Sequence, residues 1–101
     1  MAEIVWTGPA SLDVREIVEY IALDNPEAAH QIAVRIERHV QQLERHPLSG
    51  SFVPEMPSSS LKQLVEPPCR IFYRFEHDKV YILHVLRSEQ LLRRSRFEAD
   101  E

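Results

Sequence analysis

With 101 residues and a net charge of −4, the chain is long enough for one small domain, which we expect to span residues 1–101. Its single cysteine, Cys69, excludes an internal disulfide and fits a reducing compartment. No apolar stretch approaches the ~20 residues needed to cross a bilayer, and the N-terminus has no basic segment before an apolar run. We therefore expect a cytoplasmic protein with no membrane partner.

The net charge conceals an asymmetry along the chain. Residues 70–97 hold seven basic and three acidic side chains, whereas residues 1–69 hold five basic and ten acidic ones. A basic C-terminal third on an acidic support suits an acidic protein segment or a nucleic-acid backbone. An ordinary solvated surface is the alternative interpretation of the same charges.

Two amphipathic helices are predicted after a short strand over residues 3–7. The first helix covers about 9–23, where apolar residues recur with the i, i+3, i+4, i+7 spacing of one buried stripe. Asn25 can cap a second helix and Pro26 suits its first turn, which predicts a helix over 26–46. So short a link predicts an antiparallel helical hairpin.

The second half of the chain predicts strands. Residues 47–60 are rich in Pro, Ser and Gly and are predicted to form a loop. A short strand over 61–65 follows, and two longer strands over 70–76 and 79–87 are joined by a tight turn. Both long strands carry apolar residues on both faces, which predicts a central pair. Ser88 can cap a short last helix.

Strict alternation assigns the faces of the two long strands. Ile71, Tyr73 and Phe75 are predicted to share one face, and Arg70, Phe72, Arg74 and Glu76 the other. In the next strand, alternation places His84 with Ile82 and Leu86. The whole order predicts an α+β fold, with an N-terminal strand, an antiparallel helical hairpin on one face of a small antiparallel sheet, a short C-terminal helix and one core.

Several segments together resemble a known family. They are Asn-Pro-Glu-Ala-Ala at 25–29, His-Pro-Leu-Ser-Gly at 46–50, Arg-Ile-Phe-Tyr-Arg-Phe at 70–75 and Val-Tyr-Ile-Leu-His-Val-Leu-Arg at 80–87. In this order they resemble the RelE/ParE superfamily of toxins from type II toxin–antitoxin modules, over about residues 3–96. The resemblance implies one of two activities: RelE-like toxins are ribosome-dependent messenger-RNA endonucleases, and ParE-like toxins inhibit DNA gyrase.

The chemistry favours the ParE-like branch. Metal-independent RNA cleavage needs a base, an acid and cations that stabilise charge on the phosphorus. The loop 47–60 has no Lys or Arg, Glu55 is its only charged residue, and Phe97 near the C-terminus cannot transfer a proton. His84 is more typical of a hydrogen-bonded core histidine than of a catalytic base. We therefore expect no catalytic residues, no metal and no cofactor.

The resemblance then implies binding partners. One is a cognate ParD-like antitoxin, with which the toxin would form a hetero-oligomer. The other is DNA gyrase, alone or with its bound DNA, which would become trapped with cleaved DNA. The candidate residues for binding gyrase or antitoxin are Arg70, Arg74, Arg87, Gln90, Arg93 and Arg94. Two alternatives stay open. One is a RelE-like nuclease with a site formed by Arg70, Arg74, His84 and Arg87, and the other is a non-toxic member that only binds an antitoxin.

Overall fold

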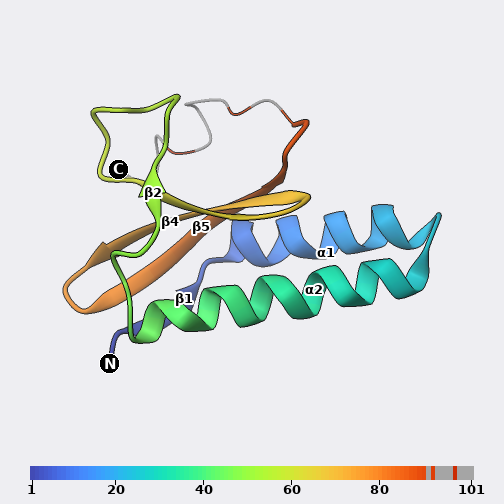
Figure 1. Cartoon of the computed structure of the whole chain (residues 1–101), viewed down its shortest axis with the longest axis horizontal. Coiled ribbons are helices and arrows are strands. Elements are labelled where there is room, and N and C mark those ends of the chain that lie inside the picture. The colour runs from blue at the N-terminus through green and yellow to red at the C-terminus, as the bar shows by residue number, and fades with distance from the viewer. Residues whose placement is uncertain (91, 93–96, 98–101) are drawn as a thin grey trace.

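The computed structural model describes residues 1–90, 92 and 97, and shows two helices against one face of a five-stranded sheet (Figure 1). The elements are β1 (Glu3–Trp6), α1 (Gly8–Ala22), α2 (Pro26–Gln41), the 3₁₀ helix η1 (Gln42–Glu44), β2 (Ser51–Phe52), β3 (Lys62–Glu66), β4 (Cys69–Glu76) and β5 (Lys79–Arg87). The predicted α+β class, helical hairpin and central strand pair are confirmed. Within the described residues, no helix is both long and apolar enough to span a bilayer.

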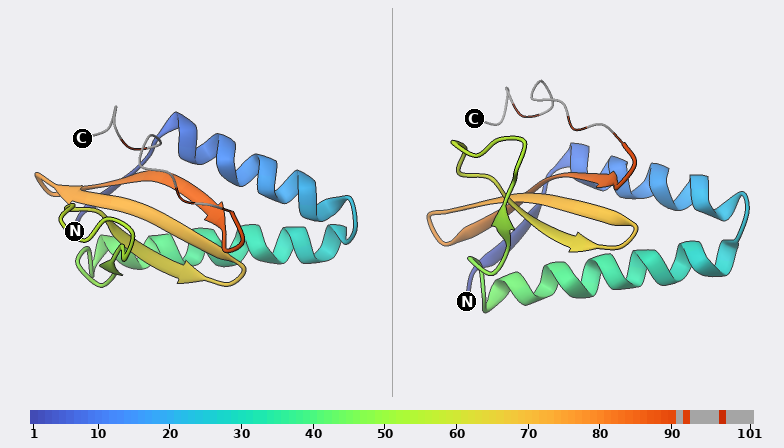
Figure 2. Two further views of the ribbon diagram at one scale, coloured as in Figure 1. Left: turned by 90° about the horizontal axis from the view of Figure 1, so that it is seen from above. Right: turned by 45° about the horizontal axis from the view of Figure 1, so that its top comes forward.

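Local capping determines where the two helices begin. The Thr7 hydroxyl accepts from the Ala10 N–H at 3.4 Å, and the Asn25 side-chain oxygen accepts from the Ala28 N–H at 3.0 Å. Each helix has a proline in its first turn, where no amide hydrogen is required. The predicted cap at Asn25 is therefore confirmed, and the helices run side by side in both views of Figure 2.

The sheet has the order β1-β5-β4-β3-β2 and differs from the prediction in two details. It is mixed rather than wholly antiparallel, because β1 pairs in parallel with β5, with Glu3 opposite Lys79 and Trp6 opposite Ile82. The segment 47–60 is not loop throughout, since Ser51–Phe52 form a short edge strand on β3. Neither pairing has a local sequence signal, because both depend on distant partners.

A two-residue turn joins β4 to β5 as predicted. His77 and Asp78 have φ values of 54° and 61°, the left-handed conformation that a two-residue hairpin turn requires at both positions. The turn register places Glu76 opposite Lys79 and Arg74 opposite Tyr81.

A β-bulge in β5 overturns the predicted alternation of that strand. Tyr73 pairs with Ile82 but its neighbour Phe72 pairs with His84, so Leu83 is an extra residue on the β5 side. The bulge shifts the face of every later side chain on β5. His84 therefore lies on the face of Leu86, as predicted, but not on that of Ile82, which faces the helices.

The sheet has two buried cores, one on each face, whereas the sequence predicted a single core. The core under the helices contains Ala10, Ile17, Ile32, Ile36, Val40, Leu43, Leu64, Cys69, Ile71, Tyr73, Val80, Ile82 and Val85. On the other face, the segment after η1 folds across the sheet (Figure 2), and the core there contains Val53, Met56, Leu61, Phe72, Leu83, Leu86 and Phe97. Burial of a large apolar side chain contributes about 1.5–3 kcal/mol, so this second core holds the segment down.

The predicted C-terminal helix lies mostly outside the described residues. Ser88 and Glu89, where it was expected to begin, form a turn, and the Ser88 hydroxyl donates to the Pro68 carbonyl at 3.0 Å instead of capping a helix. The positions 91 and 93–96 are not described.

Candidate functional site

Arg70 is held by four hydrogen bonds on the sheet face opposite the helices. Its two terminal nitrogens donate to the two carboxylate oxygens of Glu55 at 2.7 and 2.8 Å. Its Nε and one terminal nitrogen also donate to Gln63 Oε1 at 2.9 and 2.7 Å. The guanidinium carbon lies 4.9 Å from the centre of the Phe72 ring. The guanidinium is thus fixed from β3, from β4 and from the segment between β2 and β3.

This arrangement changes the acid–base properties of both charged groups. The hydrogen bonds from Arg70 hold the pKa of the Glu55 carboxyl below its usual value, and those to Glu55 raise the pKa of the Arg70 guanidinium. Both groups are therefore charged at neutral pH and neutralise each other. An arginine in this state presents little net charge to an external phosphate.

Arg74 lies on the same face as Arg70, as the alternation of β4 predicted. Its Nε is 3.7 Å from Glu76 Oε2, and its side chain is only 19% exposed. The two arginines are four residues apart on one strand, which corresponds to about 13 Å. Among the candidate arginines that the structure describes, Arg70 and Arg74 are therefore the two that share a surface.

Arg87 lies on the opposite face from Arg70 and Arg74. It pairs with Cys69, whose side chain is in the core under the helices, and its guanidinium carbon lies 4.2 Å from the centre of the Tyr20 ring of α1. One terminal nitrogen donates to Glu89 Oε1 at 2.6 Å. Gln90 Oε1 accepts from the Arg87 backbone N–H at 2.7 Å. The candidate binding residues Arg70, Arg74 and Arg87 are thus divided between the two faces of the sheet.

The remaining predicted residues differ in what the structure shows of them. Arg93 and Arg94 lie outside the described residues. Arg87 and Gln90 line a cavity of about 230 Å³ between α1 and the end of β5, together with Asp13, Glu16, Ile17, Tyr20, Val85 and Leu86. The cavity therefore places Arg87 and Gln90, two of the candidate binding residues, next to Asp13 and Glu16 of α1.

His84 is a buried, hydrogen-bonded histidine with 9% of its surface exposed. Its Nδ1 lies 2.9 Å from Asp13 Oδ2, and that oxygen also accepts from the Val85 N–H at 3.0 Å. The edge of one ring meets the face of the other between His84 and Phe97, whose centroids are 5.3 Å apart. The Asp13 carboxyl thus contacts the histidine ring and the backbone of the next residue through a single oxygen.

Cys69, the first residue of β4, is fully buried in the core under the helices. Burial raises the pKa of its thiol to about 11, so the thiol is neutral and a poor nucleophile at neutral pH. Among the residues that the structure describes, no three His, Cys, Asp or Glu side chains are grouped closely enough to hold a metal ion.

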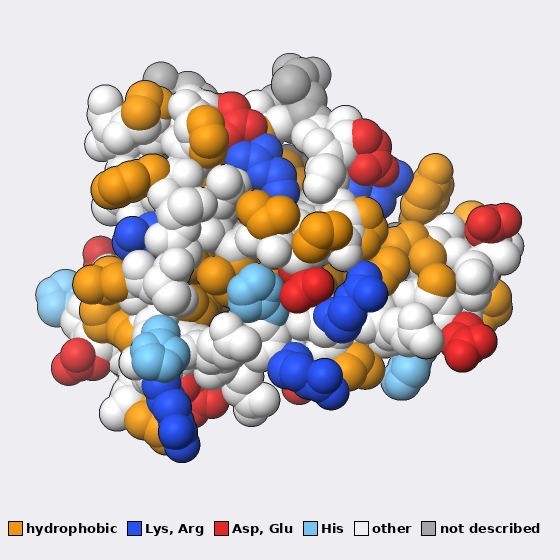
Figure 3. All heavy atoms as spheres, in the orientation of Figure 1, with side chains coloured by type: hydrophobic (Ala, Val, Ile, Leu, Met, Phe, Trp, Pro, Cys, Tyr) orange, Lys and Arg blue, Asp and Glu red, His pale blue; other side chains and the backbone are white. Residues whose placement is uncertain are grey.

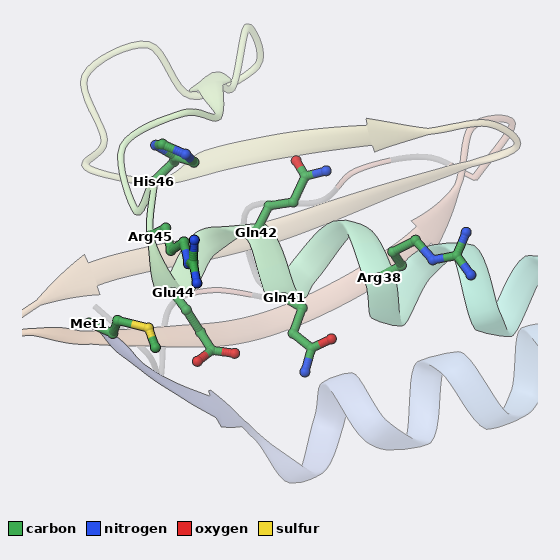
Figure 4. Close-up of a pocket in the computed structure, with 7 residues that line it drawn as sticks. All are labelled: Met1, Arg38, Gln41, Gln42, Glu44, Arg45 and His46. Atoms are coloured by element: carbon green, nitrogen blue, oxygen red, sulfur yellow. The ribbon is translucent and has the colours of Figure 1, made fainter.

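A larger cavity lies elsewhere, at the C-terminal end of α2 (Figure 4). It has a volume of about 670 Å³, and its lining residues are Met1, Arg38, Gln41, Gln42, Glu44, Arg45 and His46. Their side chains point in different directions rather than toward one point, as Figure 4 shows. The cavity is thus an open depression and contains none of the predicted site residues.

A second basic group on α2 was missed by the sequence analysis, which treated residues 1–69 as acidic. Figure 3 shows several basic and His side chains over the helical layer, with acidic side chains among them. Arg35 donates to the Pro67 carbonyl at 3.0 Å, and His39 lies 3.1 Å from Glu66 of β3. These two side chains lie on the flank of α2 next to β3, and the i, i+3 and i+4 spacing of basic and His residues in 35–46 would have indicated one such flank.

The partners of the arginines were also missed. Tyr20 and Gln63, and likewise Asp13 as the partner of His84, gave no signal, because their contacts depend on how distant elements pack. Glu55 did give one: a single charge in an otherwise uncharged segment of Pro, Ser and apolar residues is a candidate ion-pair partner for a strand arginine.

Comparisons with known proteins identify the class. Residues 4–92 match the family described as ParE toxin of type II toxin-antitoxin system, parDE. Over 92 residues the chain is 30% identical to Toxin RelE2 of Caulobacter vibrioides, which covers 90% of this chain and all of that protein. The chain is thus a toxin of the RelE/ParE superfamily of type II toxin–antitoxin systems.

Within that superfamily, the chain belongs to the ParE toxin family. A solved structure of the chromosomal ParDE system from P. aeruginosa matches it with a TM-score of 0.68 and 26% identity, covering 86% of this chain and 96% of that one. The RelBE2 toxin–antitoxin complex from Mycobacterium tuberculosis matches with a TM-score of 0.60 and 21% identity, covering 85% and 96%. At 21% identity, this second match shows a shared fold.

Proposed function

We propose that this chain is a toxin that inhibits DNA gyrase by binding, acts in the cytoplasm, and catalyses no reaction of its own. The observation that carries the proposal is the internal pairing of the groups that a nuclease would use. Arg70 is bound to Glu55, Arg87 to Glu89, and His84 to Asp13. In RNA cleavage, cations stabilise charge that develops on the substrate, and cations already neutralised by carboxylates do this poorly.

Internal contacts also hinder proton transfer by His84. A general base must come within about 2.6–3.2 Å of the hydroxyl proton that it removes. His84 has its Nδ1 turned to Asp13 and its ring packed in a T-shaped arrangement against Phe97, and it is almost completely buried. The family match over residues 4–92 supports the ParE-like branch independently of this geometry.

The second candidate function is ribosome-dependent RNA cleavage, which the 30% identity to Toxin RelE2 favours. Its site would combine Arg70, Arg74, His84 and Arg87. The separation of Arg87 from Arg70 onto opposite faces of the sheet weighs against that combination. A toxin-like protein that only binds an antitoxin is the third candidate.

We propose a ParD-like antitoxin as the second partner, in a hetero-oligomer. Arg35 and Arg38 of α2, and Arg45 just after η1, line two neighbouring depressions, which suits an acidic segment. Apolar side chains stand exposed on the same helical layer, including Tyr20 at 58% and Leu23 at 87%. An amphipathic, acidic helix would satisfy both features.

Two assays on the purified protein distinguish the candidates. We expect inhibition of gyrase supercoiling, no cleavage of messenger RNA in a translating extract, and reversal of the inhibition by the antitoxin. Cleavage of RNA with unchanged supercoiling would replace the proposal with the second candidate, and inactivity in both assays with antitoxin binding would replace it with the third.

A pair of matched variants locates the binding face. Arg87→Ala removes a guanidinium that stacks on Tyr20 and lines the 230 Å³ cavity, and we expect the lost contact surface to weaken gyrase inhibition. Arg15→Ala removes an exposed cation of α1 that is paired with Glu19, and serves as the control. Equal inhibition by the two variants, both folded by circular dichroism, would remove Arg87 from the binding face.

A further inference from the structure

A row of basic side chains follows one side of α2 and continues past η1. Two depressions lie along this row and share Arg38 and Gln42. One, of about 310 Å³, is also lined by Arg35, His39 and Glu66. The other is the 670 Å³ depression of Figure 4. We call the α2 flank the set of residues Arg35, Arg38, His39, Gln42, Arg45 and His46.

Two arginines of the α2 flank have no internal partner. Within the described part of the chain, Arg38 and Arg45 are exposed and have neither a hydrogen bond nor an ion pair. Every other arginine that the structure describes has a nitrogen 3.7 Å or less from a carboxylate oxygen. Because arginine binds carboxylates and phosphates through paired N–H donors, Arg38 and Arg45 have those donors available for an external anion.

The spacing of these cations suits an extended polyanion rather than a small one. Arg35 and Arg45 are separated by about 15 Å along the axis of α2 and η1, and Arg38 lies between them. The side chains around the depression diverge instead of meeting at one point (Figure 4), so they do not enclose a compact ligand. Each strand of duplex DNA carries a phosphate about every 3.4 Å of its axis, and a row of phosphates can contact such cations in succession.

The other residues of the two depressions distinguish between polyanions. Among the residues that line them, Met1 is the one apolar side chain, and none is aromatic. An amphipathic peptide helix needs apolar anchors, and single-stranded nucleic acid needs aromatic rings on which its bases stack. A duplex backbone needs only cations and polar donors. We propose that the α2 flank contacts the phosphate backbone of double-stranded DNA, chiefly through Arg38 and Arg45.

Acidic groups near the α2 flank limit the contact to these arginines. The Glu66 carboxylate lies 3.1 Å from His39 and 3.6 Å from Arg35, so it neutralises that end of the row. Glu44 lines the depression beside Arg45 and opposes an incoming phosphate. The inference rests on the proposed function for its setting, because the DNA at hand is the duplex held by gyrase. An acidic antitoxin segment on the same arginines would exclude that DNA.

The test measures binding of a short fluorescein-labelled DNA duplex by anisotropy at low salt. We expect the double variant Arg38→Gln and Arg45→Gln to bind about tenfold more weakly than the unchanged protein, because charge-assisted contacts are lost. The slope of log K against log salt should become shallower by about 1.8 for two lost phosphate contacts. Glu44→Gln should tighten binding, since it removes the opposing charge.

The matched control is the double variant Arg15→Gln and Lys79→Gln. It removes the same two charges from exposed positions away from the α2 flank. Equal affinities of the two double variants, both folded by circular dichroism, would overturn the proposal. Binding of labelled poly-L-glutamate through Arg38 and Arg45, without binding of the duplex, would also overturn it and would assign the surface to an acidic polypeptide.

Gyrase supercoiling assays on the same variants separate this inference from the proposed function. We expect the loss of Arg38 and Arg45 to weaken gyrase inhibition more than the control does. A protein that binds the duplex through these arginines but does not inhibit gyrase would overturn the proposed function and leave the DNA contact standing. Inhibition that is unchanged without both arginines would overturn a role of the α2 flank in holding gyrase-bound DNA.

Discussion

One carboxylate oxygen of Asp13 binds both the side chain of His84 and the backbone next to it. Asp13 Oδ2 lies 2.9 Å from His84 Nδ1 and accepts from the Val85 N–H at 3.0 Å. The β1 strand ends at Trp6, so it does not pair with this part of β5. The first turns of α1 take its place, and Asp13 supplies the acceptor that a neighbouring strand would have provided.

Asp13→Ala should therefore destabilise the protein by about 2 kcal/mol, because it withdraws the acceptor of two donors in a region of low exposure. Asp13→Asn should cost less, since it retains a side-chain oxygen. Chemical denaturation measures both, and Asp24→Ala, at an exposed position after α1, is the control. A cost equal to that of the control would show that the helix is held to β5 by packing alone.

Gly50 should not tolerate a side chain. Its N–H donates to the Tyr73 hydroxyl at 2.9 Å, and a Cβ on Gly50 would lie 2.6 Å from that hydroxyl and 2.7 Å from the Gln63 carbonyl oxygen. We expect Gly50→Ala to cost about 1–3 kcal/mol by overpacking.

The control for this position is Gly8→Ala. A Cβ there meets no atom within 4 Å, so the substitution should leave stability unchanged or slightly higher. Denaturation midpoints of the two variants that agree within error would contradict the close approach of Gly50 to Tyr73.

Phe97 should anchor the second core. Its ring is fully buried, with centroids 5.6 Å from Phe72 and 5.3 Å from His84. Phe97→Ala should cost about 3 kcal/mol, as large-to-small changes of buried aromatics do. Phe52→Ala, at a residue that is 67% exposed, should change stability by less than about 0.5 kcal/mol. Thermal unfolding distinguishes the two, and similar losses would contradict the assigned burial.

The Glu55–Arg70 pair should stabilise the protein at neutral pH and not in acid. Arg70 lowers the pKa of Glu55 in the folded state, so the contribution is present above the ordinary pKa of 4.5 and is lost as the pH falls through the lower folded-state value. The contribution is about 1 kcal/mol at most, because Glu55 is partly exposed and screened by solvent.

Unfolding of the unchanged protein and of Glu55→Gln measures this contribution. The difference in unfolding free energy should be constant from pH 6 to 8 and should shrink below about pH 4.5, where the unfolded carboxyl takes up a proton. A difference that stays constant into acid would mean that the Glu55 charge does not stabilise the fold.

Local patterns were sufficient for much of this fold. The spacing of apolar residues and the cap at Asn25 predicted both helices, and alternation in β4 placed Arg70 and Arg74 on one face. These predictions succeeded because they concern periodicity within one element. The superfamily was suggested separately, by the resemblance of several sequence segments, and the family match over residues 4–92 then showed it.

Long-range contacts determined what the sequence did not predict. The bulge at Leu83 arises from the pairing of two strands, and it reverses the faces of all later β5 side chains. Strict alternation therefore misplaced His84 relative to Ile82. In the candidate site, the arginines were identified but their partners were not, because Tyr20 and Glu55 reach them from elements distant in the sequence.

The parallel pairing of β1 with β5 has a consequence for the newly made chain. The Thr7 hydroxyl donates to the Ile82 carbonyl at 2.7 Å across 75 positions of sequence, so the first strand finds its partner only when nearly all of the chain exists. Contacts between such distant residues form late and slowly in folding. Synthesis that stops before Lys79 yields a polypeptide whose first strand has no neighbour, so a cell that makes this toxin meets the complete fold only when translation of the β5 codons is finished.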